Sequence, residues 1–445
     1  MSEELSELLD GVGVASEDDQ DRVISNIVAN KEPEEVALLL EALPFNQRLE
    51  SWDNVPQEEQ LAILVAMRSD PRESLLDEMP LESFDVLFQG MEAEDLVELS
   101  ESLPSRLVDR ALRAMDQKQR SYFEGAKQYS EDLAGHWADH HLLVLPQNAK
   151  VRDGLRLLRR EIPIYADTIF LINRTGHFSD ALRISRIMGA PDHLPLVDLS
   201  EESIAVINAN DSAVDSALKV QKSVFTALPI TDESGILLGR LDIGTSCQLA
   251  NEYYERQLMA GAGMDEDEDL FSPIVKSAKN RAIWLGINLL TAFLASWFIG
   301  LFEATLQQVV ALAVLMPIVA SMGGIAGSQT LTLMIRGHAL GQITHSNFRD
   351  LLKKEVGVGI INGVIWSLVI GGVVSVWFDD PMIGIVIGLA IIVNIVIAAI
   401  SGAYIPVILN KFKLDPALSG SVILTTGTDV VGFVAFLGLG TMLLL

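Results

Sequence analysis

The stretch MIGIVIGLAIIVNIVIAAISGAYIPVIL, residues 382–409, contains no Asp, Glu, Lys or Arg. About 20 apolar residues in a helix span the hydrocarbon core of a bilayer, so this run is predicted to cross a membrane. Four other runs are long and apolar enough to do the same: 282–302, 308–335, 356–377 and 417–445. The sequence therefore predicts an all-α, five-helix transmembrane domain over residues 282–445.

The loops between these runs indicate an orientation. Basic residues cluster before the first run, between the second and third, and between the fourth and fifth: Lys276, Lys279, Arg281, Arg336, Arg349, Lys353, Lys354, Lys411 and Lys413. The other two loops carry only acids, namely Glu303, Asp379 and Asp380. Because basic loops stay in the cytoplasm, we expect a multi-pass protein of the cell (inner or plasma) membrane. Its N-terminus is then cytoplasmic and its C-terminus lies outside.

The charge of the 445-residue chain is unevenly divided. Residues 271–445 hold nine of the 32 Lys and Arg and seven of the 60 Asp and Glu, so the remainder of the chain is strongly acidic. Phosphate recognition needs clustered Lys and Arg, and nucleic acid is therefore not an expected partner. The single cysteine, Cys247, excludes an intrachain disulfide framework and a thiolate metal cluster.

One carboxylate lies at membrane depth, Asp429 in LTTGTDVVGF (424–433). Placing it there costs about 2.5–3.5 kcal/mol, and none of the five runs offers a basic partner. Ser421 and Thr425, eight and four positions earlier, share its helical face. Carboxylate and hydroxyl oxygens suit a hard cation such as hydrated Mg²⁺. The pattern favours a cation site, the alternative being a protonated Asp429 bonded to a neighbouring helix.

The second run combines helix breakers with polar groups, as in SMGGIAGSQT (321–330). Backbone groups freed at membrane depth must face protein or water. We therefore expect a pore or structural motif that includes Pro317, Gly323, Gly324, Gly327, Gln329 and, from the fourth run, Asn394. The pairs Gly359/Gly363 and Gly384/Gly388 have the four-residue spacing that lets membrane helices approach closely.

The part of the chain before the membrane runs contains two different sequence patterns. Residues 20–135 show leucine-rich helical periodicity broken by prolines, which predicts a superhelical α-domain over 1–135. Residues 142–257 repeat a strand–helix–strand–strand pattern, with a hairpin expected at DESG (232–235), so an α/β tandem is predicted over 136–258. Such pairs are usually regulatory, and no catalytic constellation is evident, so an enzyme is not expected. His136, His140 and His141 have the spacing of metal ligands, but a solvated surface is the favoured interpretation.

Several motifs, in order along the chain, resemble the MgtE family of magnesium transporters. They are YSEDLAG (129–135), ALPITDESGILLGRL (227–241), VLMPIVASMGGIAGSQTLTLMIRGHALGQI (314–343), KLDPALSG (413–420) and LTTGTDVVGF. The resemblance implies a tandem pair of cystathionine-β-synthase (CBS) domains and a linker with a connecting helix, about 268–281 within 259–281. It also implies a homodimer whose pore is lined by residues 417–445, with Asp429 as pore carboxylate. Asp415 would couple pore and cytoplasmic domains through bound Mg²⁺.

The resemblance further implies that Mg²⁺ is both transported and regulatory. Bound ions would neutralise acidic clefts and hold the pore closed. The candidate regulatory acids are Glu94, Asp95, Asp132, Glu252, Glu255 and the run Asp265, Glu266, Asp267, Glu268 and Asp269. The chain departs from the family pattern at Ile325 and Ser421, each where an Asn is usual. A nucleotide in the CBS pair is possible but unsupported, because its Ser/Thr-x-x-Asp pattern is not evident around 242–245.

The function predicted from the sequence is therefore a dimeric Mg²⁺ transporter or channel in the bilayer, gated by cytoplasmic Mg²⁺. Two alternatives remain open: a broader Co²⁺/Mg²⁺ transporter coupled to an ion gradient, and a non-conducting membrane sensor.

Overall fold

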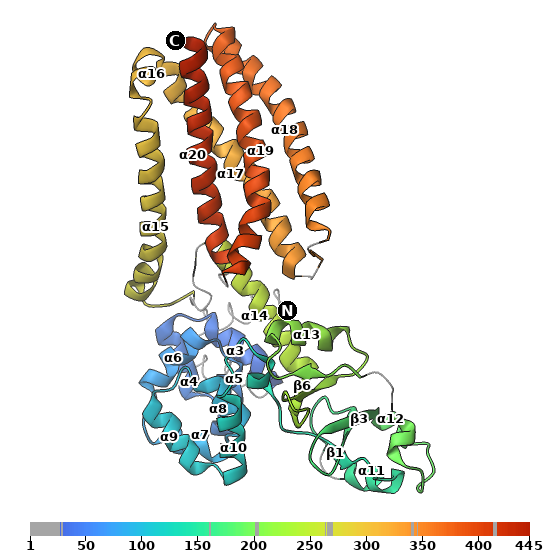
Figure 1. Ribbon diagram of the computed structural model, residues 1–445. Helices are drawn as coiled ribbons and strands as arrows, with labels where there is room; N and C mark the ends of the chain where they lie inside the picture. Colours follow the sequence, from blue (N-terminus) through green and yellow to red (C-terminus); the bar gives the residue numbers. More distant parts are fainter. Residues whose placement is uncertain are drawn as a thin grey trace. The chain divides into compact units, whose positions relative to one another are not determined.

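The computed structural model describes residues 27, 30–159, 162–200, 204–262, 264, 270–339, 342–344, 346–412 and 416–445. The chain forms two compact units, one reaching along the chain to Arg256 and the other built mainly from residues after Val275 (Figure 1). The first contains short helices followed by small sheets, and the second contains long apolar helices. The predicted multidomain fold class is confirmed.

Short helices form the first part of the N-terminal unit, as the periodicity predicted. They are α3 (Pro33–Glu41), α4 (Phe45–Asp53), α5 (Gln57–Ala66), α6 (Ser69–Glu78), α7 (Ser83–Gly90), α8 (Ala93–Leu99), α9 (Ser105–Ala114) and α10 (Gln117–Ala126). Pro44, Pro56 and Pro104 each lie immediately before a helix. Proline has no backbone N–H to donate, so none of these residues can extend the preceding helix. Leucines such as Leu64 and Leu96 are fully buried in one continuous core, so each helix is stabilised by its neighbours.

Two three-stranded sheets follow, and they repeat one topology. In the first module β1 (Val144–Pro146) pairs in parallel with β2 (Thr168–Ile172), which pairs antiparallel with β3 (Phe178–Arg183). In the second, β4 (Ile207–Asn208), β5 (Ala227–Thr231) and β6 (Leu237–Asp242) pair in the same way. Gly235 adopts φ +88° between β5 and β6, which confirms the predicted hairpin.

Helices complete both modules. They are η1 (Ala134–Trp137), α11 (Val151–Leu157), α12 (Ile184–Ile187), η2 (Leu196–Leu199), α13 (Ala213–Lys222) and α14 (Ile243–Gly261). α11 and α13 each connect the two parallel strands of their module, which is the crossover that parallel pairing requires.

The second unit contains five helices long and apolar enough to cross a membrane, within the described residues. They are α15 (Ile274–Gly300), α17 (Val310–Ala339), α18 (Phe348–Trp377), α19 (Pro381–Lys411) and α20 (Pro416–Leu444). Short α16 (Glu303–Gln308) follows α15 and contains Glu303. α17, α19 and α20 pack on one another and α18 packs on α19. The five predicted membrane helices are confirmed.

Two features of this unit differ from the sequence expectation. α15 already begins at Ile274, so residues 274–281 of the expected connecting helix form its first turns, and residues 270–273 are not helical. α17 continues without interruption through Pro317 and the glycine-rich segment 321–330. A membrane helix tolerates such residues because packing against neighbours compensates for the weakened backbone ladder.

The glycines of this segment serve helix packing. A Cβ atom on Gly323 would lie 2.2 Å from the side-chain nitrogen of buried Asn394, and one on Gly432 would lie 2.6 Å from the same atom. A Cβ on Gly402 would lie 2.7 Å from the Gly327 carbonyl oxygen. α17, α19 and α20 therefore meet at positions where a side chain does not fit.

Gly402→Ala is expected to lower the free energy of unfolding by about 1–3 kcal/mol, because the added methyl meets rigid backbone of α17. The measurement is the thermal unfolding midpoint of the full chain in detergent. Gly372→Ala is the matched control, since a Cβ there has open space around it. Equal midpoints for both variants would contradict the assigned contact.

Candidate functional site

α20 carries a row of polar side chains on a face that the unit covers only in part. Thr425 is exposed, and Ser421 and Asp429 are half-buried. These three residues are spaced by four positions, so they follow one line along the helix. The Thr425 hydroxyl donates to the Ser421 carbonyl at 2.9 Å, which leaves its oxygen lone pairs available to a cation.

The adjacent face of α20 packs inward. Leu424 and Thr428 are fully buried, and so are Phe436 and Leu437. The Thr428 hydroxyl donates to the Thr425 carbonyl at 3.0 Å and is thereby satisfied within the helix. Thr428 therefore belongs to the face of α20 that packs inward.

The structure separates the other predicted membrane residues into two groups. Asn394, Gly323 and Gly327 are buried between helices, and the Asn394 amide donates to the Val319 carbonyl at 2.8 Å. Pro317 and Gln329 are exposed and Gly324 is half-buried with open space beside it, so these three lie away from the buried packing contacts. Asp415 lies outside the described residues.

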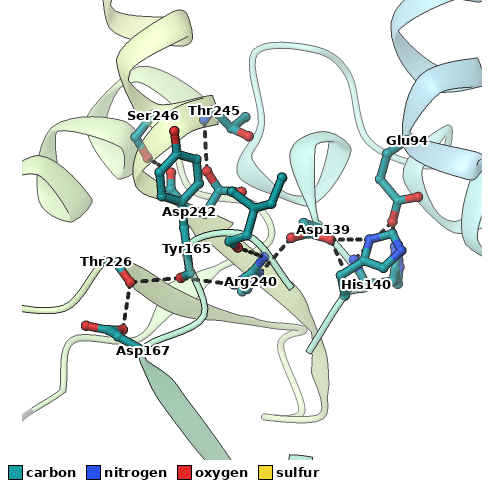
Figure 2. A network of polar contacts seen from close by, with 12 residues as sticks. Glu94, Asp139, His140, Tyr165, Asp167, Thr226, Arg240, Asp242, Thr245 and Ser246 are labelled. Atoms are coloured by element: carbon teal, nitrogen blue, oxygen red, sulfur yellow. Dashed lines mark hydrogen bonds and ion pairs between the residues drawn. The ribbon is translucent and has the colours of Figure 1, made fainter. Parts of the chain in front are cut away.

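A second set of polar groups joins the helical array to the strand modules inside the N-terminal unit (Figure 2). Glu94 of α8 accepts from the backbone nitrogen of His140 at 3.0 Å and contacts its Nδ1 at 2.9 Å. The His140 ring stacks on Tyr122 of α10, with 3.7 Å between centroids. Burial raises the pKa of Glu94, but the His140 hydrogen bonds outweigh it and the pKa is lowered overall.

The next residue, His141, is held between two acids. Its Nδ1 lies 2.9 Å from Asp139 and its Nε2 lies 3.1 Å from Glu92. The hydrogen bond to Asp139, followed by the charges of Asp139, Glu92 and Glu94, raises the pKa of His141 to about 9 despite burial. His141 is therefore protonated at neutral pH and bridges α8 to the segment before β1.

The interpretation as a solvated surface was wrong for His136 and His140, which are buried and half-buried, whereas His141 is exposed. His136 is buried, with Nδ1 3.1 Å from the Tyr129 carbonyl, and burial lowers its pKa. His140 and His141 contact acids of α8 and of the segment that precedes it. The segment that contains His140 and His141 joins the helical array to the strand modules, which local sequence does not reveal.

Arg240 of β6 ties the two strand modules together (Figure 2). Its side chain is buried and donates to Asp139 at 2.7 Å, the Ile164 carbonyl at 2.7 Å and the Tyr165 carbonyl at 3.2 Å. Thr226 donates to Asp167 at 2.6 Å beside it. Although burial raises the pKa of Asp139, the His141 hydrogen bond and the Arg240 charge hold it below its ordinary value.

Tyr165 lies next to residues 242–245, the segment that lacks the Ser/Thr-x-x-Asp nucleotide pattern. It adopts φ 55°, and its ring lies so close to Gly244 that a Cβ there would be 2.7 Å away. Asp242 accepts from the Thr245 backbone nitrogen at 3.0 Å, which engages this carboxylate in capping α14.

The remaining predicted regulatory acids lie mainly on α8 and α14. Glu255 pairs with Arg68 at 2.8 Å. Burial and then the Glu98 carboxylate raise the pKa of Glu252, although its hydrogen bond with Gln248 opposes this. Burial, with the charges of Glu92 and Glu94, raises the pKa of Asp95 to about 6.

Asp132 is exposed, and its backbone carbonyl accepts from Ala213 at 2.7 Å. The run from Asp265 to Asp269 lies outside the described residues. Sequence reasoning missed Glu92, Glu98 and Asp139. Glu92 belongs to the same acidic run EAED (92–95) as two predicted acids, which was an available signal.

Comparisons with known proteins agree with this architecture. The family model MgtE, described as a divalent cation transporter, matches residues 316–439, and the MgtE intracellular N domain matches residues 31–132. The chain is 24% identical over 442 residues to the magnesium transporter MgtE of Bacillus subtilis, covering 98% of this chain and 97% of that one. It is 26% identical over 335 residues to the Thermus thermophilus magnesium transporter MgtE, covering 74% of each.

Among solved structures, the CBS pair domain of a proposed Mg²⁺ transporter from Shewanella oneidensis is 34% identical. It covers 38% of this chain and 98% of its own, with a TM-score of 0.33. Five apolar helices, small-residue helix contacts and a carboxylate at membrane depth define a multi-pass transport protein for divalent cations. The chain belongs to the MgtE family.

Proposed function

We propose that this chain transports Mg²⁺ through a pore formed where the α20 helices of two copies meet. The observation that carries the proposal is the row Ser421, Thr425 and Asp429 on α20, of which Thr425 is exposed and the other two are half-buried. In a single copy this row would face lipid, where a carboxylate and hydroxyl groups are poorly satisfied. A second copy on a two-fold axis covers both rows and leaves a polar path between them.

α15 leaves a large apolar surface uncovered in a single copy. Ala295 is the buried residue of this helix, while large apolar side chains such as Leu290, Phe293 and Trp297 are exposed. Lipid covers part of such a surface, and a second copy covers the rest.

The composition of the row suits a hydrated Mg²⁺ ion. Mg²⁺ gives up its water reluctantly and is held by one or two carboxylates with neutral oxygens. Two copies of Asp429, with Thr425 and Ser421 one and two turns earlier on α20, supply this set at the pore axis. Asp415, the residue before Pro416 in the sequence, would link pore and N-terminal unit through a further ion.

Gating follows from the acids of the N-terminal unit. With this unit in the cytoplasm and the C-terminus outside, Glu94, Asp95, Glu252 and Glu255 sense internal Mg²⁺, as do Asp132 and the run 265–269. Like charges a few ångströms apart repel unless a cation lies between them. Bound Mg²⁺ therefore stabilises the closed arrangement of the N-terminal unit and the pore. When Mg²⁺ dissociates, the pore is free to open.

The decisive experiment is uptake by proteoliposomes of the full chain, with Mg²⁺, Co²⁺, Mn²⁺ and Ca²⁺ in competition. Mg²⁺ entry without an imposed Na⁺ or H⁺ gradient supports a channel. Dependence on such a gradient, with Co²⁺ competing equally, would favour the coupled transporter. No uptake of any cation would favour the non-conducting sensor and overturn the proposal.

Mg²⁺ is expected to protect the segment after α14 from limited proteolysis, because it offsets repulsion among Glu98, Glu252 and Glu255. The double variant Glu98→Gln/Glu252→Gln should be protected less by Mg²⁺, since two of the charges are gone. Glu124→Gln, an exposed acid of α10, serves as the control. Equal cleavage with and without Mg²⁺ in the wild type would contradict metal-dependent closure.

A further inference from the structure

Two carboxylates and an imidazole converge on one point of the N-terminal unit. Glu92, Glu94 and His141 each present a ligand atom, and these atoms lie within 4.8 Å of one another. Glu92 is the residue before α8, Glu94 is in its first turn, and His141 precedes β1. The group therefore combines nitrogen and oxygen donors from segments far apart in the sequence.

The His141 ring is oriented as in many protein metal sites. Asp139 contacts Nδ1 at 2.9 Å, so the ring is fixed with Nε2 directed at Glu92, 3.1 Å away. A carboxylate on the far nitrogen of a histidine selects the tautomer and orientation that a metal ion needs. Arg240 holds Asp139 in turn at 2.7 Å, so this support is itself rigid.

Glu94 offers an oxygen that the protein does not use. Both contacts with His140 go to Oε1. Its Oε2 is buried and has no hydrogen-bond partner among the residues that the structure describes. A buried carboxylate oxygen without a partner is costly, and a cation placed beside it removes that cost.

We propose that Glu92, Glu94 and His141 bind a first-row transition-metal dication of the Zn²⁺ class. An imidazole nitrogen suits Zn²⁺, Co²⁺ or Ni²⁺, whereas Mg²⁺ prefers oxygen donors alone. The ion takes the place of the proton on Nε2 and completes its coordination with water. Because its ligands come from the start of α8 and from the segment before β1, the ion fastens the helical array to the strand modules.

The test uses the full-length protein in detergent with Cys247→Ser in every sample, so that the exposed thiol does not bind the probe. Zn²⁺ affinity is measured by calorimetry in saturating Mg²⁺, which fills oxygen-only sites beforehand. His141→Gln and Glu92→Gln are each expected to weaken the site by about 10–100-fold or more. His193→Gln, an exposed histidine of the first module, is the control and should bind as the parent does.

Co²⁺ substitution gives a second, structural readout. The visible absorption bands of bound Co²⁺ should appear in the parent and in His193→Gln and vanish in His141→Gln. Circular dichroism of each variant confirms that it is folded. Unchanged Zn²⁺ affinity in His141→Gln, or complete displacement of Zn²⁺ by Mg²⁺, would overturn the proposal. Both readouts are taken without transport, so failure here is distinct from failure of the proposed Mg²⁺ uptake.

Discussion

Asp429→Asn is expected to slow Mg²⁺ uptake by at least about a hundredfold. At an effective dielectric constant near 20, two unit charges 4 Å apart interact by about 4 kcal/mol. Each 1.4 kcal/mol is a factor of ten in rate, so loss of even part of this attraction at the axis has a large effect. Asparagine keeps the size of the side chain, and initial uptake rates in proteoliposomes therefore report the charge.

Asp379→Asn is the matched control for this experiment. Asp379 is exposed, lies in the loop between α18 and α19, and has φ 51°, a conformation that asparagine also tolerates. It should transport as the wild type does. Normal uptake by Asp429→Asn would show that Asp429 is not the pore carboxylate.

The membrane helices were predictable because their signal is local. The charge-free run 382–409 lies within α19, and length and apolar composition suffice to predict such a helix. The role of Gly323 was not predictable in this way. Its space is filled by Asn394, 71 positions later, and a single sequence does not show which helices will be neighbours.

The joint in the N-terminal unit escaped prediction for the same reason. His140 and His141 were judged by the residues beside them, but their partners Glu94 and Glu92 are more than 45 positions earlier. The sequence analysis listed Glu94 and Asp95 of the run EAED as candidate regulatory acids, but it did not connect this run to the histidines. The contacts between these acids and the two histidines depend on the tertiary structure, which brings the two segments together.

Arg240→Met is expected to lower the unfolding free energy of the strand modules by about 1–3 kcal/mol, because two carbonyls lose their buried donor and Asp139 keeps His141 as its remaining charged partner. Asp139 would lose its 2.7 Å contact, and the Ile164 and Tyr165 carbonyls would lose their donor. The measurement is amide hydrogen exchange of β5 and β6 in the full-length protein. Arg174→Met, an exposed arginine of the first module, should exchange as the wild type does.

A double variant separates the buried charge from simple loss of packing. Asp139→Asn added to Arg240→Met also removes the contact with His141, and the destabilisation of the double variant should be smaller than the sum of the two single changes, because the Asp139–Arg240 pair is lost only once. If the cost came only from lost van der Waals contacts, the costs of the two changes would simply add. Exchange rates in Arg240→Met equal to those in Arg174→Met would show that this ion pair does not hold the modules together.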